Sequence, residues 1–169
     1  MKNKIEVRFI CIFIIFLISG QVIYYFSKDK FENLMINKLN VGVSVKLINM
    51  INSEMLAVQK GKDIISKDMR MTVAVGCDGT DGMLIVIAAI LAFPMILIDK
   101  IKGVILGIIV VYLTNLLRII MLFFILKFYP GYFDYMHTYI GQFIVIFSAG
   151  LFFLMWINNI SKKNMLNAQ

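Results

Sequence analysis

Three side chains that lie far apart in the sequence could together perform acyl transfer. Cys77 offers a thiol nucleophile inside a glycine-rich stretch, and Arg118 offers a fixed cation. His137, the one histidine of the chain, can donate and accept a proton near neutral pH. In such chemistry the thiol attacks a carbonyl, the cation stabilises the oxyanion that forms, and the imidazole protonates the leaving amine. The three residue types therefore suit cleavage or transfer at an amide bond.

The stretch from Gly76 to Gly82 is the polar, glycine-rich joint before an apolar segment. Its glycines permit unusual backbone angles, Asp78 or Thr80 can cap the following helix, and Asp81 suits the first turn. A thiol at a helix N-terminus feels the positive end of the helix dipole, which favours the nucleophilic thiolate, whereas the adjacent carboxylate opposes it. A structural cap with an incidental cysteine explains the same residues.

Arg118 lies within a long apolar segment, where a guanidinium costs at least about 2.5 kcal/mol to insert. We therefore expect it to face the protein interior and to have a partner. Asn115 precedes it by three residues, shares its helix face, and can hydrogen-bond or orient it. The same two polar residues could instead lock helices together without any catalytic role.

The elements that must position these side chains are membrane helices. The chain is 60% apolar and 16% charged, with a mean hydropathy of +0.86, whereas soluble domains carry roughly 25% charged residues. This composition excludes a water-soluble globule and a disordered chain. The net charge is +7, and seven of the 17 basic residues lie in the two tails and one short loop beside only Glu6 and Asp99. This distribution indicates membrane orientation rather than nucleic-acid binding. The region 27–79 holds eight more basic residues, but six acids nearly balance them.

We predict an all-α membrane protein that forms a single domain over residues 1–169. Its four transmembrane helices are expected at about 8–26, 80–98, 103–126 and 138–157. Basic flanks place both termini and the loop at 99–102 in the cytoplasm. Cys77, Arg118 and His137 would then all lie toward the outer face, where they could meet in one pocket.

The outer region, residues 27–79, is expected to be structured. Apolar residues at helical spacing predict two amphipathic helices, broken near Gly42. Further along, Gly61-Lys62-Asp63 is a turn signal, and Met69, Met71, Val73 and Val75 alternate with Arg70, Thr72 and Ala74. This alternation predicts a small β-hairpin just before the second span.

Two other chemistries fit these residues less well. A metal site could be built from Cys77, Asp78, Asp81 and His137, but their spacing lacks the D-x-D-x-D-G pattern of a calcium loop. A quinone-linked thiol oxidoreductase needs paired cysteines, and Cys11 is expected near the inner end of the first helix, across the membrane from Cys77. We expect neither a metal nor another cofactor.

The order of Cys77, then Asn115-Leu-Leu-Arg118, then His137 before the last helix resembles the exosortase and archaeosortase family of membrane cysteine transpeptidases. The stretch Gly-Cys-Asp-Gly-Thr-Asp-Gly-Met from Gly76, followed by Ala-Ala-Ile-Leu-Ala-Phe-Pro over residues 88–94, is most similar to the exosortase H subtype. The similarity covers about residues 73–147.

This resemblance implies a multi-pass cell-membrane enzyme that cleaves a C-terminal sorting signal of exported proteins, made of a short motif, a spanning helix and a basic tail. Cys77 would attack the peptide bond, Arg118 would stabilise the oxyanion, and His137 would act as acid and base. The thioacyl product would pass to an amine or other nucleophile, or to water in a protease. Asn115 and Asp78 would position these three residues without reacting themselves. A nonenzymatic membrane scaffold or assembly subunit is the alternative.

Overall fold

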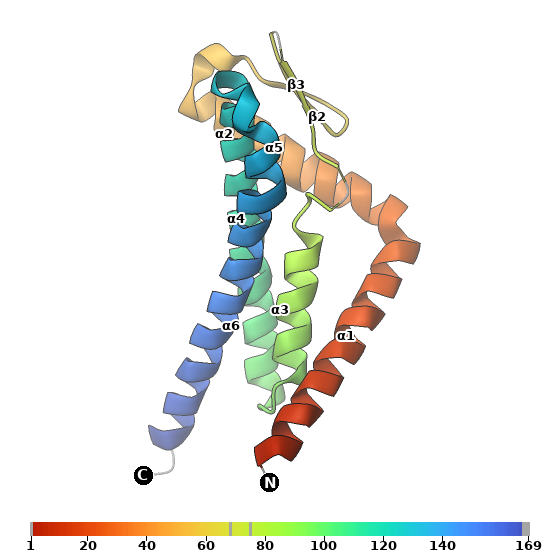
Figure 1. The fold of residues 1–169 in the computed structure, drawn as a ribbon, viewed down its shortest axis with the longest axis vertical. Coiled ribbons are helices and arrows are strands. Elements are labelled where there is room, and N and C mark those ends of the chain that lie inside the picture. Colours follow the sequence, from red (N-terminus) through yellow and green to blue (C-terminus); the bar gives the residue numbers. More distant parts are fainter. Residues whose placement is uncertain (1, 68, 75, 167–169) are drawn as a thin grey trace.

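The computed structural model describes residues 2–67, 69–74 and 76–166 as a bundle of long helices with a small sheet at one end (Figure 1). Helix α1 (Lys2–Phe31) runs along the bundle and continues into the π-helical η1 (Glu32–Gly42) and the α-helical α2 (Val43–Ile51). Both termini lie at the end of the bundle opposite the sheet (Figure 1). We call these the terminal end and the sheet end.

The second half of the chain forms two long helical passes and one short one. Helix α3 (Thr80–Ala92) descends from the sheet end, and α4 (Leu97–Phe128) returns to it (Figure 1). The chain then descends again through a continuous series of helical segments, namely η3 (Pro130–Tyr132), α5 (Phe133–Tyr135), the π-helical η4 (Met136–Ile140) and α6 (Gly141–Leu166).

Four of the described helical segments are long and apolar enough to cross a membrane, which confirms the predicted fold class. They are Glu6–Ser27, Asn33–Ile51, Leu97–Phe128 and Pro130–Lys162. The helix predicted over 80–98 is shorter, because it ends at Ala92 and the next four residues, which include Pro94, are not helical. Proline has no backbone N–H and disfavours helix at the residue before it.

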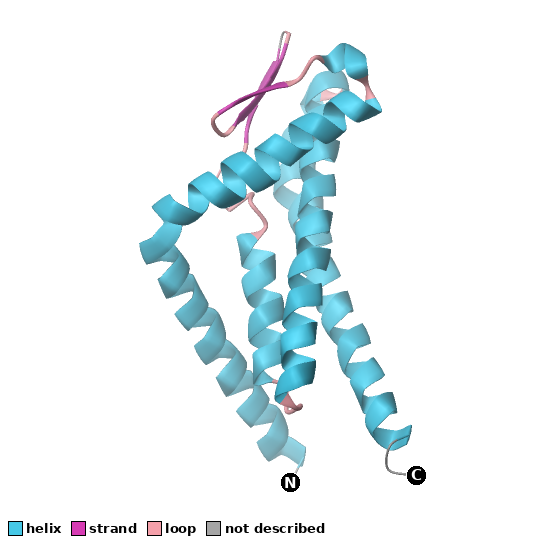
Figure 2. Ribbon diagram, turned by 180° about the vertical axis from the view of Figure 1, so that it is seen from behind, coloured by secondary structure: helices cyan, strands magenta, loops and turns pink. Residues whose placement is uncertain are grey.

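The segment predicted as two outer helices broken near Gly42 is instead one helical run. Gly42 has helical angles, with φ −61° and ψ −40°, and the hydrogen-bond pattern changes there from π to α. The predicted break is therefore wrong. A glycine in a helix lowers its stability by roughly 1 kcal/mol but does not by itself end it. This run crosses obliquely over the sheet end of the bundle (Figure 2).

The predicted hairpin is confirmed and is part of a three-stranded antiparallel sheet. Its strands are β1 (Val58–Lys60), β2 (Asp63–Ser66) and β3 (Met69–Thr72), in that spatial order. Gly61, with a positive φ of 62°, forms the turn between β1 and β2. Ile64 pairs with Met71, and both are buried. Val75, the last residue of the predicted alternation, lies outside the described residues.

Helix α4 has one buried face, and that face carries the predicted polar residues. The buried stripe includes Gly103, Gly107, Val111, Asn115, Arg118 and Leu122. These residues recur every three or four positions, which places them on one side of a helix. Toward the terminal end the stripe packs against an apolar cluster shared with α3 and α6, and toward the sheet end against a second cluster shared with α2 and the strands.

Candidate active site

The loop that carries Cys77 owes its shape to two glycines. Gly76 and Gly79 have φ values of 89° and 82°, a left-handed region that side chains with a Cβ rarely adopt. Gly79 also caps α3, and a Cβ added there would lie 2.8 Å from Cγ of Asn115. The absence of that Cβ lets the loop approach α4 closely. The sequence predicted unusual backbone angles here, and these are confirmed.

The structure brings together the three side chains singled out from the sequence. The Sγ atom of Cys77 lies 3.0 Å from Nε2 of His137, and Nη2 of Arg118 lies 3.9 Å from the same sulfur. Cys77 comes from the loop before α3, Arg118 from α4 and His137 from η4. The three share a small cavity of about 20 Å³ with residues of β3, the loop after it, α4 and α5. These are Met71, Thr72, Val73, Ile119, Leu122 and Phe133.

Arg118 faces the protein interior, as the unfavourable free energy of a guanidinium in lipid predicts. Its side chain is 2% exposed, and Nη2 donates to the backbone oxygen of His137 at 3.4 Å. Within the described part of the chain its buried Nε has no hydrogen-bond partner. A Cβ on Gly141 would lie 2.6 Å from that Nε. The glycine therefore provides the space that the guanidinium occupies.

Asn115 supports the site through a partner that differs from the predicted one. Its Nδ2 donates to the backbone oxygen of Cys77 at 3.3 Å, and no hydrogen bond joins it to Arg118 among the residues described. The residue is fully buried, with Oδ1 unpartnered in the same part of the structure. Asn115 thus holds the backbone of Cys77, whereas its place beside Arg118 on one helix face is as predicted.

Asp78 points away from the thiol and ties the loop to other elements. Its carboxylate accepts hydrogen bonds from the hydroxyl of Tyr24 in α1, at 2.8 Å, and from the hydroxyl of Thr80. Its backbone oxygen accepts from Nδ2 of the buried Asn40 at 2.9 Å. Asp78 also accepts weakly from the backbone N–H of Thr80, at 3.4 Å, as expected of a residue at a helix start. The loop is therefore held from α1, η1 and α4 at once.

The sequence analysis missed several residues that shape the site. The ring of Phe133 stacks on the imidazole of His137, with centroids 5.6 Å apart and planes 12° from parallel. Their spacing of four residues could have revealed this contact, since such pairs are neighbours on a helix. Gly141 follows at the same interval. Nothing in the local sequence marks Tyr24 or Asn40, because their contacts with Asp78 join residues far apart in the chain.

The wall of the cavity formed by β3 is fixed by a buried carboxylate. Asp63 in β2 accepts hydrogen bonds from the hydroxyl of Thr72, at 2.7 Å, and from the guanidinium of Arg70. The Thr72 and Arg70 hydrogen bonds lower the pKa of Asp63 below its usual value. The carboxylate therefore stays charged and continues to join the two strands over the ordinary range of pH.

The residues suggested for a metal site do not form a ligand set. Asp81 accepts a hydrogen bond from Gln21 of α1, and the carboxylate of Asp78 accepts one from Tyr24. Among residues 2–67, 69–74 and 76–166 there is no group of three or more His, Cys, Asp or Glu side chains positioned to hold a metal ion. Cys11 is exposed on α1, in the half that leads to the terminal end, far along the bundle from Cys77.

The arrangement can carry out thiol chemistry. Nε2 of His137 lies within hydrogen-bonding distance of Sγ of Cys77 and can accept the thiol proton. The guanidinium of Arg118 lies next to the sulfur, where negative charge would develop on an attacked carbonyl. Stacking on Phe133 and the backbone contacts to Cys77 restrain the groups before any substrate binds.

Comparison with known proteins assigns the chain to a family. The model of the transmembrane exosortase family matches residues 6–156, which include the loop of Cys77, the buried face of α4 and the turn of His137. No curated protein and no solved structure matches the chain. The family match extends over most of the chain, from α1 into α6, and it agrees with the resemblance carried by the spacing of the three polar residues. The chain belongs to the transmembrane exosortase family.

Proposed function

We propose that the protein is a membrane-embedded cysteine transpeptidase that cleaves a C-terminal sorting signal of exported, membrane-anchored proteins. The observation that carries this proposal is the 3.0 Å separation of Cys77 Sγ and His137 Nε2, with Arg118 Nη2 beside the sulfur. Membership of the exosortase family supports a membrane transpeptidase of that type.

The first half of the reaction forms a thioester. Nε2 of His137 takes the proton of the Cys77 thiol as the sulfur attacks the carbonyl carbon of the scissile bond. The carbonyl oxygen gains the negative charge and is stabilised by the guanidinium of Arg118. The intermediate then collapses: the C–N bond breaks, and the leaving nitrogen takes the proton from the imidazolium. The acyl group remains on the sulfur.

The second half releases the product and restores the enzyme. An incoming amine, or another nucleophile, gives its proton to His137 and attacks the thioester carbon. The C–S bond breaks, and the proton returns from the imidazolium to the sulfur. If water is the nucleophile, the same steps make the protein a protease. The order of steps is the same in both cases, but an amine forms a new C–N bond and water a new C–O bond, so the acceptor alone decides between transfer and hydrolysis.

The proposed orientation places the site on the outer side of the cell membrane, with both termini in the cytoplasm. Two observations support it. The termini share one end of the bundle (Figure 1), and the net positive charge is larger at that end. Seven Lys or Arg residues lie there beside only Glu6 and Asp99, whereas the eight in residues 27–79 are nearly balanced by six acids. A membrane-impermeant maleimide added to intact cells should then label Cys77 but not Cys11. Labelling that is unchanged in Cys77→Ser would contradict the orientation.

The central experiment traps the thioester in cells that express the protein. A covalent adduct between Cys77 and a shortened membrane protein should appear in the native chain and disappear after mild hydroxylamine treatment. Cys77→Ala should abolish both the adduct and substrate processing while expression and folding remain normal. Cys11→Ala is the matched control and should leave both unchanged.

A second candidate function is a nonenzymatic scaffold or assembly subunit. The hydrogen bond from Arg118 to the backbone oxygen of His137 favours it, because this contact joins α4 to the last helical pass without any chemistry. The trapping experiment also distinguishes the two functions. Unchanged substrate processing in Cys77→Ala would leave the scaffold as the remaining candidate.

A further inference from the structure

A second cavity lies at the terminal end of the bundle, far from the site of Cys77. It has a volume of about 450 Å³ and is enclosed by the start of α1, the end of α3 and the turn into α4. Its lining residues are Lys4, Arg8, Phe9, Ile12, Leu91, Ala92, Phe93, Pro94 and Lys100. Three of these residues are cations and none is an acid, while the remaining six are apolar.

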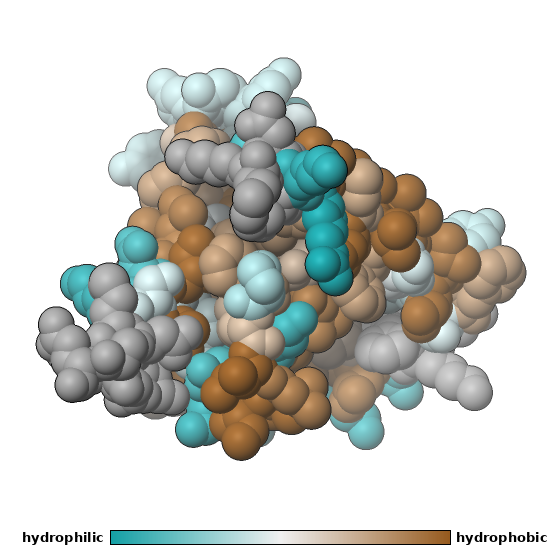
Figure 3. Space-filling view, turned by 90° about the horizontal axis from the view of Figure 1, so that it is seen from below, coloured by the Kyte–Doolittle hydropathy of each residue, from teal (hydrophilic) through white to brown (hydrophobic). Residues whose placement is uncertain are grey.

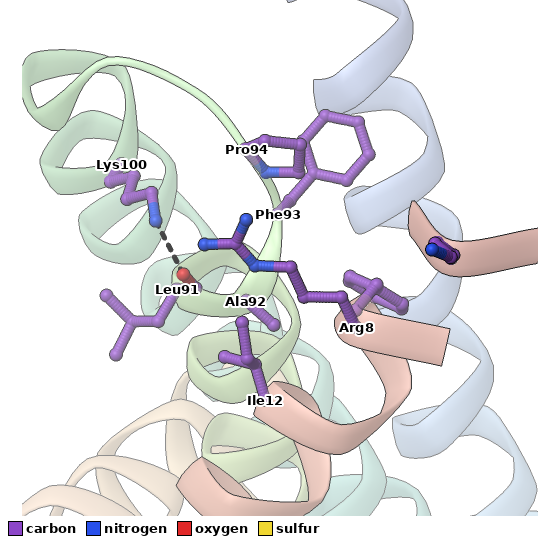
Figure 4. A pocket seen from close by; sticks show the side chains of 9 residues that line it. Arg8, Ile12, Leu91, Ala92, Phe93, Pro94 and Lys100 are labelled. Carbon is purple, nitrogen blue, oxygen red and sulfur yellow. Dashed lines mark hydrogen bonds between the residues drawn. The ribbon is translucent and has the colours of Figure 1, made fainter. Parts of the chain in front are cut away.

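Two of the cations, Arg8 and Lys100, lie in the same part of this cavity. Nζ of Lys100 donates to the backbone oxygen of Leu91, which holds the ammonium group at the open C-terminal end of α3. Figure 4 shows the side chain of Arg8 extending from α1 beneath the turn of Phe93 and Pro94, on the same side as this hydrogen bond. The described structure gives the guanidinium of Arg8 no hydrogen bond or ion pair. Positive charge therefore gathers around an apolar pocket.

The two acids nearest in sequence do not line this cavity. Glu6 lines a neighbouring cavity together with Phe153 and Ile157. Asp99 is buried and is not among the residues that line the basic cavity. A bound anion would thus meet Lys4, Arg8 and Lys100 without a carboxylate in the cavity wall.

We propose that this cavity binds an anionic glycerophospholipid, with its phosphate among Lys4, Arg8 and Lys100 and its acyl chains along the apolar walls. A guanidinium binds phosphate through two parallel N–H donors, and an ammonium binds it as a point charge. Basic pockets between transmembrane helices on the cytoplasmic side suit such headgroups. Seen from the terminal end, hydrophilic groups stand among apolar helix flanks, as a lipid at this level requires (Figure 3).

The apolar part of the cavity distinguishes a lipid from a free phosphate. An inorganic ion would satisfy the cations but would not cover the apolar surfaces that Phe9, Ile12 and Phe93 present to the cavity. Both halves of the cavity are therefore complementary to one amphiphilic molecule.

The test measures retention of lipid by the full chain, purified in detergent, with native mass spectrometry. The probes are phosphatidylglycerol, phosphatidylcholine with the same acyl chains, and glycerol 3-phosphate. We expect one tightly retained phosphatidylglycerol, at least tenfold weaker retention of phosphatidylcholine, and no retention of glycerol 3-phosphate. Equal retention of the two lipids would overturn the proposal, and retention of glycerol 3-phosphate at the same concentration would overturn the lipid as occupant.

Charge-removing variants locate the binding to this cavity. Arg8→Gln and Lys100→Gln should each weaken phosphatidylglycerol retention about fivefold, the effect of one cation at a membrane surface. Arg8→Lys should keep most of it. Lys102→Gln is the matched control, because it removes one charge at the same end of α4 from an exposed residue outside the cavity. An equal loss in Lys102→Gln would show unspecific surface attraction and would refute the site.

Discussion

The two ends of α4 use glycine in opposite ways. Near the terminal end, α4 itself supplies Gly103, where an added Cβ would lie 2.5 Å from Nε1 of Trp156 of α6. Near the sheet end the neighbours supply the glycines, since Gly79 makes room for Asn115 and Gly141 for Arg118. At the terminal end, a glycine of α4 makes room for an aromatic ring of α6. At the sheet end, glycines of neighbouring elements make room for polar side chains of α4.

This difference suggests that the glycines at one end of α4 serve helix packing and those at the other end serve the proposed reaction. Small residues let membrane helices approach closely, and van der Waals contact is a main source of their association. At the terminal end a change in a glycine should therefore act on stability. At the sheet end the same change should act on the position of groups that touch the proposed reaction, and so on activity.

The largest expected effect comes from the guanidinium at the sheet end. Arg118→Ala should lower the rate of substrate processing about 100- to 1000-fold, as loss of an oxyanion donor does in other enzymes. Arg118→Lys should lose less, because it keeps the charge but not the planar pair of donors. The measurement is single-turnover thioester formation in membranes. An unchanged rate in Arg118→Lys would show that the paired donors are not used.

The next effect tests whether a glycine can control the site. Gly141→Ala should displace the guanidinium, and a shift of about 1 Å can cost on the order of 100-fold in rate. Gly150→Ala on the same helix is the matched control, because an added Cβ there meets no atom within 4 Å. Processing rates per folded molecule are compared. If the two alanine variants behave alike, the space beside Arg118 is not needed for activity.

The terminal end should respond differently. Gly103→Ala forces Trp156 to move, and overpacking of this kind typically costs about 1–3 kcal/mol of stability. Thermal unfolding in detergent should detect this, while the processing rate per folded molecule stays near that of the native chain. A large loss of rate without a loss of stability would contradict the assignment of packing to this end.

The smallest effect concerns the sheet that forms one wall of the site. The pKa of Asp63 is lowered in the folded protein. Its contribution to the stability of the sheet is therefore fully present above the pKa of an unfolded aspartate, about 3.9. This contribution is lost as the pH falls through the lower pKa of the folded state. Amide exchange of residues 58–72, corrected for intrinsic rates, should therefore stay constant from pH 7 to pH 5. It should accelerate only below about pH 4.

Asp63→Asn should remove that acid dependence, because the asparagine does not titrate in this range. Glu54→Gln changes an exposed carboxylate in the preceding turn and is the control. Acceleration that begins well above pH 5 in the native chain would show that other groups hold the sheet together.

The sequence predicts the membrane class and the meeting of Cys77, Arg118 and His137, because both follow from strong local signals. Apolar length identifies membrane helices, and a cation in an apolar segment must face inward. The early end of α3 follows from Pro94, a local signal that the predicted span over 80–98 does not take into account. The single run from Glu32 to Ile51 is not predicted, because a glycine within a helical pattern can either end the helix or continue it. The contacts of Tyr24 and Asn40 with Asp78 instead depend on distant parts of the chain meeting.

The short length of α3 has a consequence for depth. Its 13 residues rise only about 20 Å at 1.5 Å each, less than the roughly 30 Å of bilayer hydrocarbon. If the end of α3 at Ala92 lies near one membrane surface, its other end stops about 10 Å short of the opposite surface. The thiol of Cys77, three residues before α3, would then lie below that surface, where the proposed reaction could reach a polypeptide that remains in the lipid.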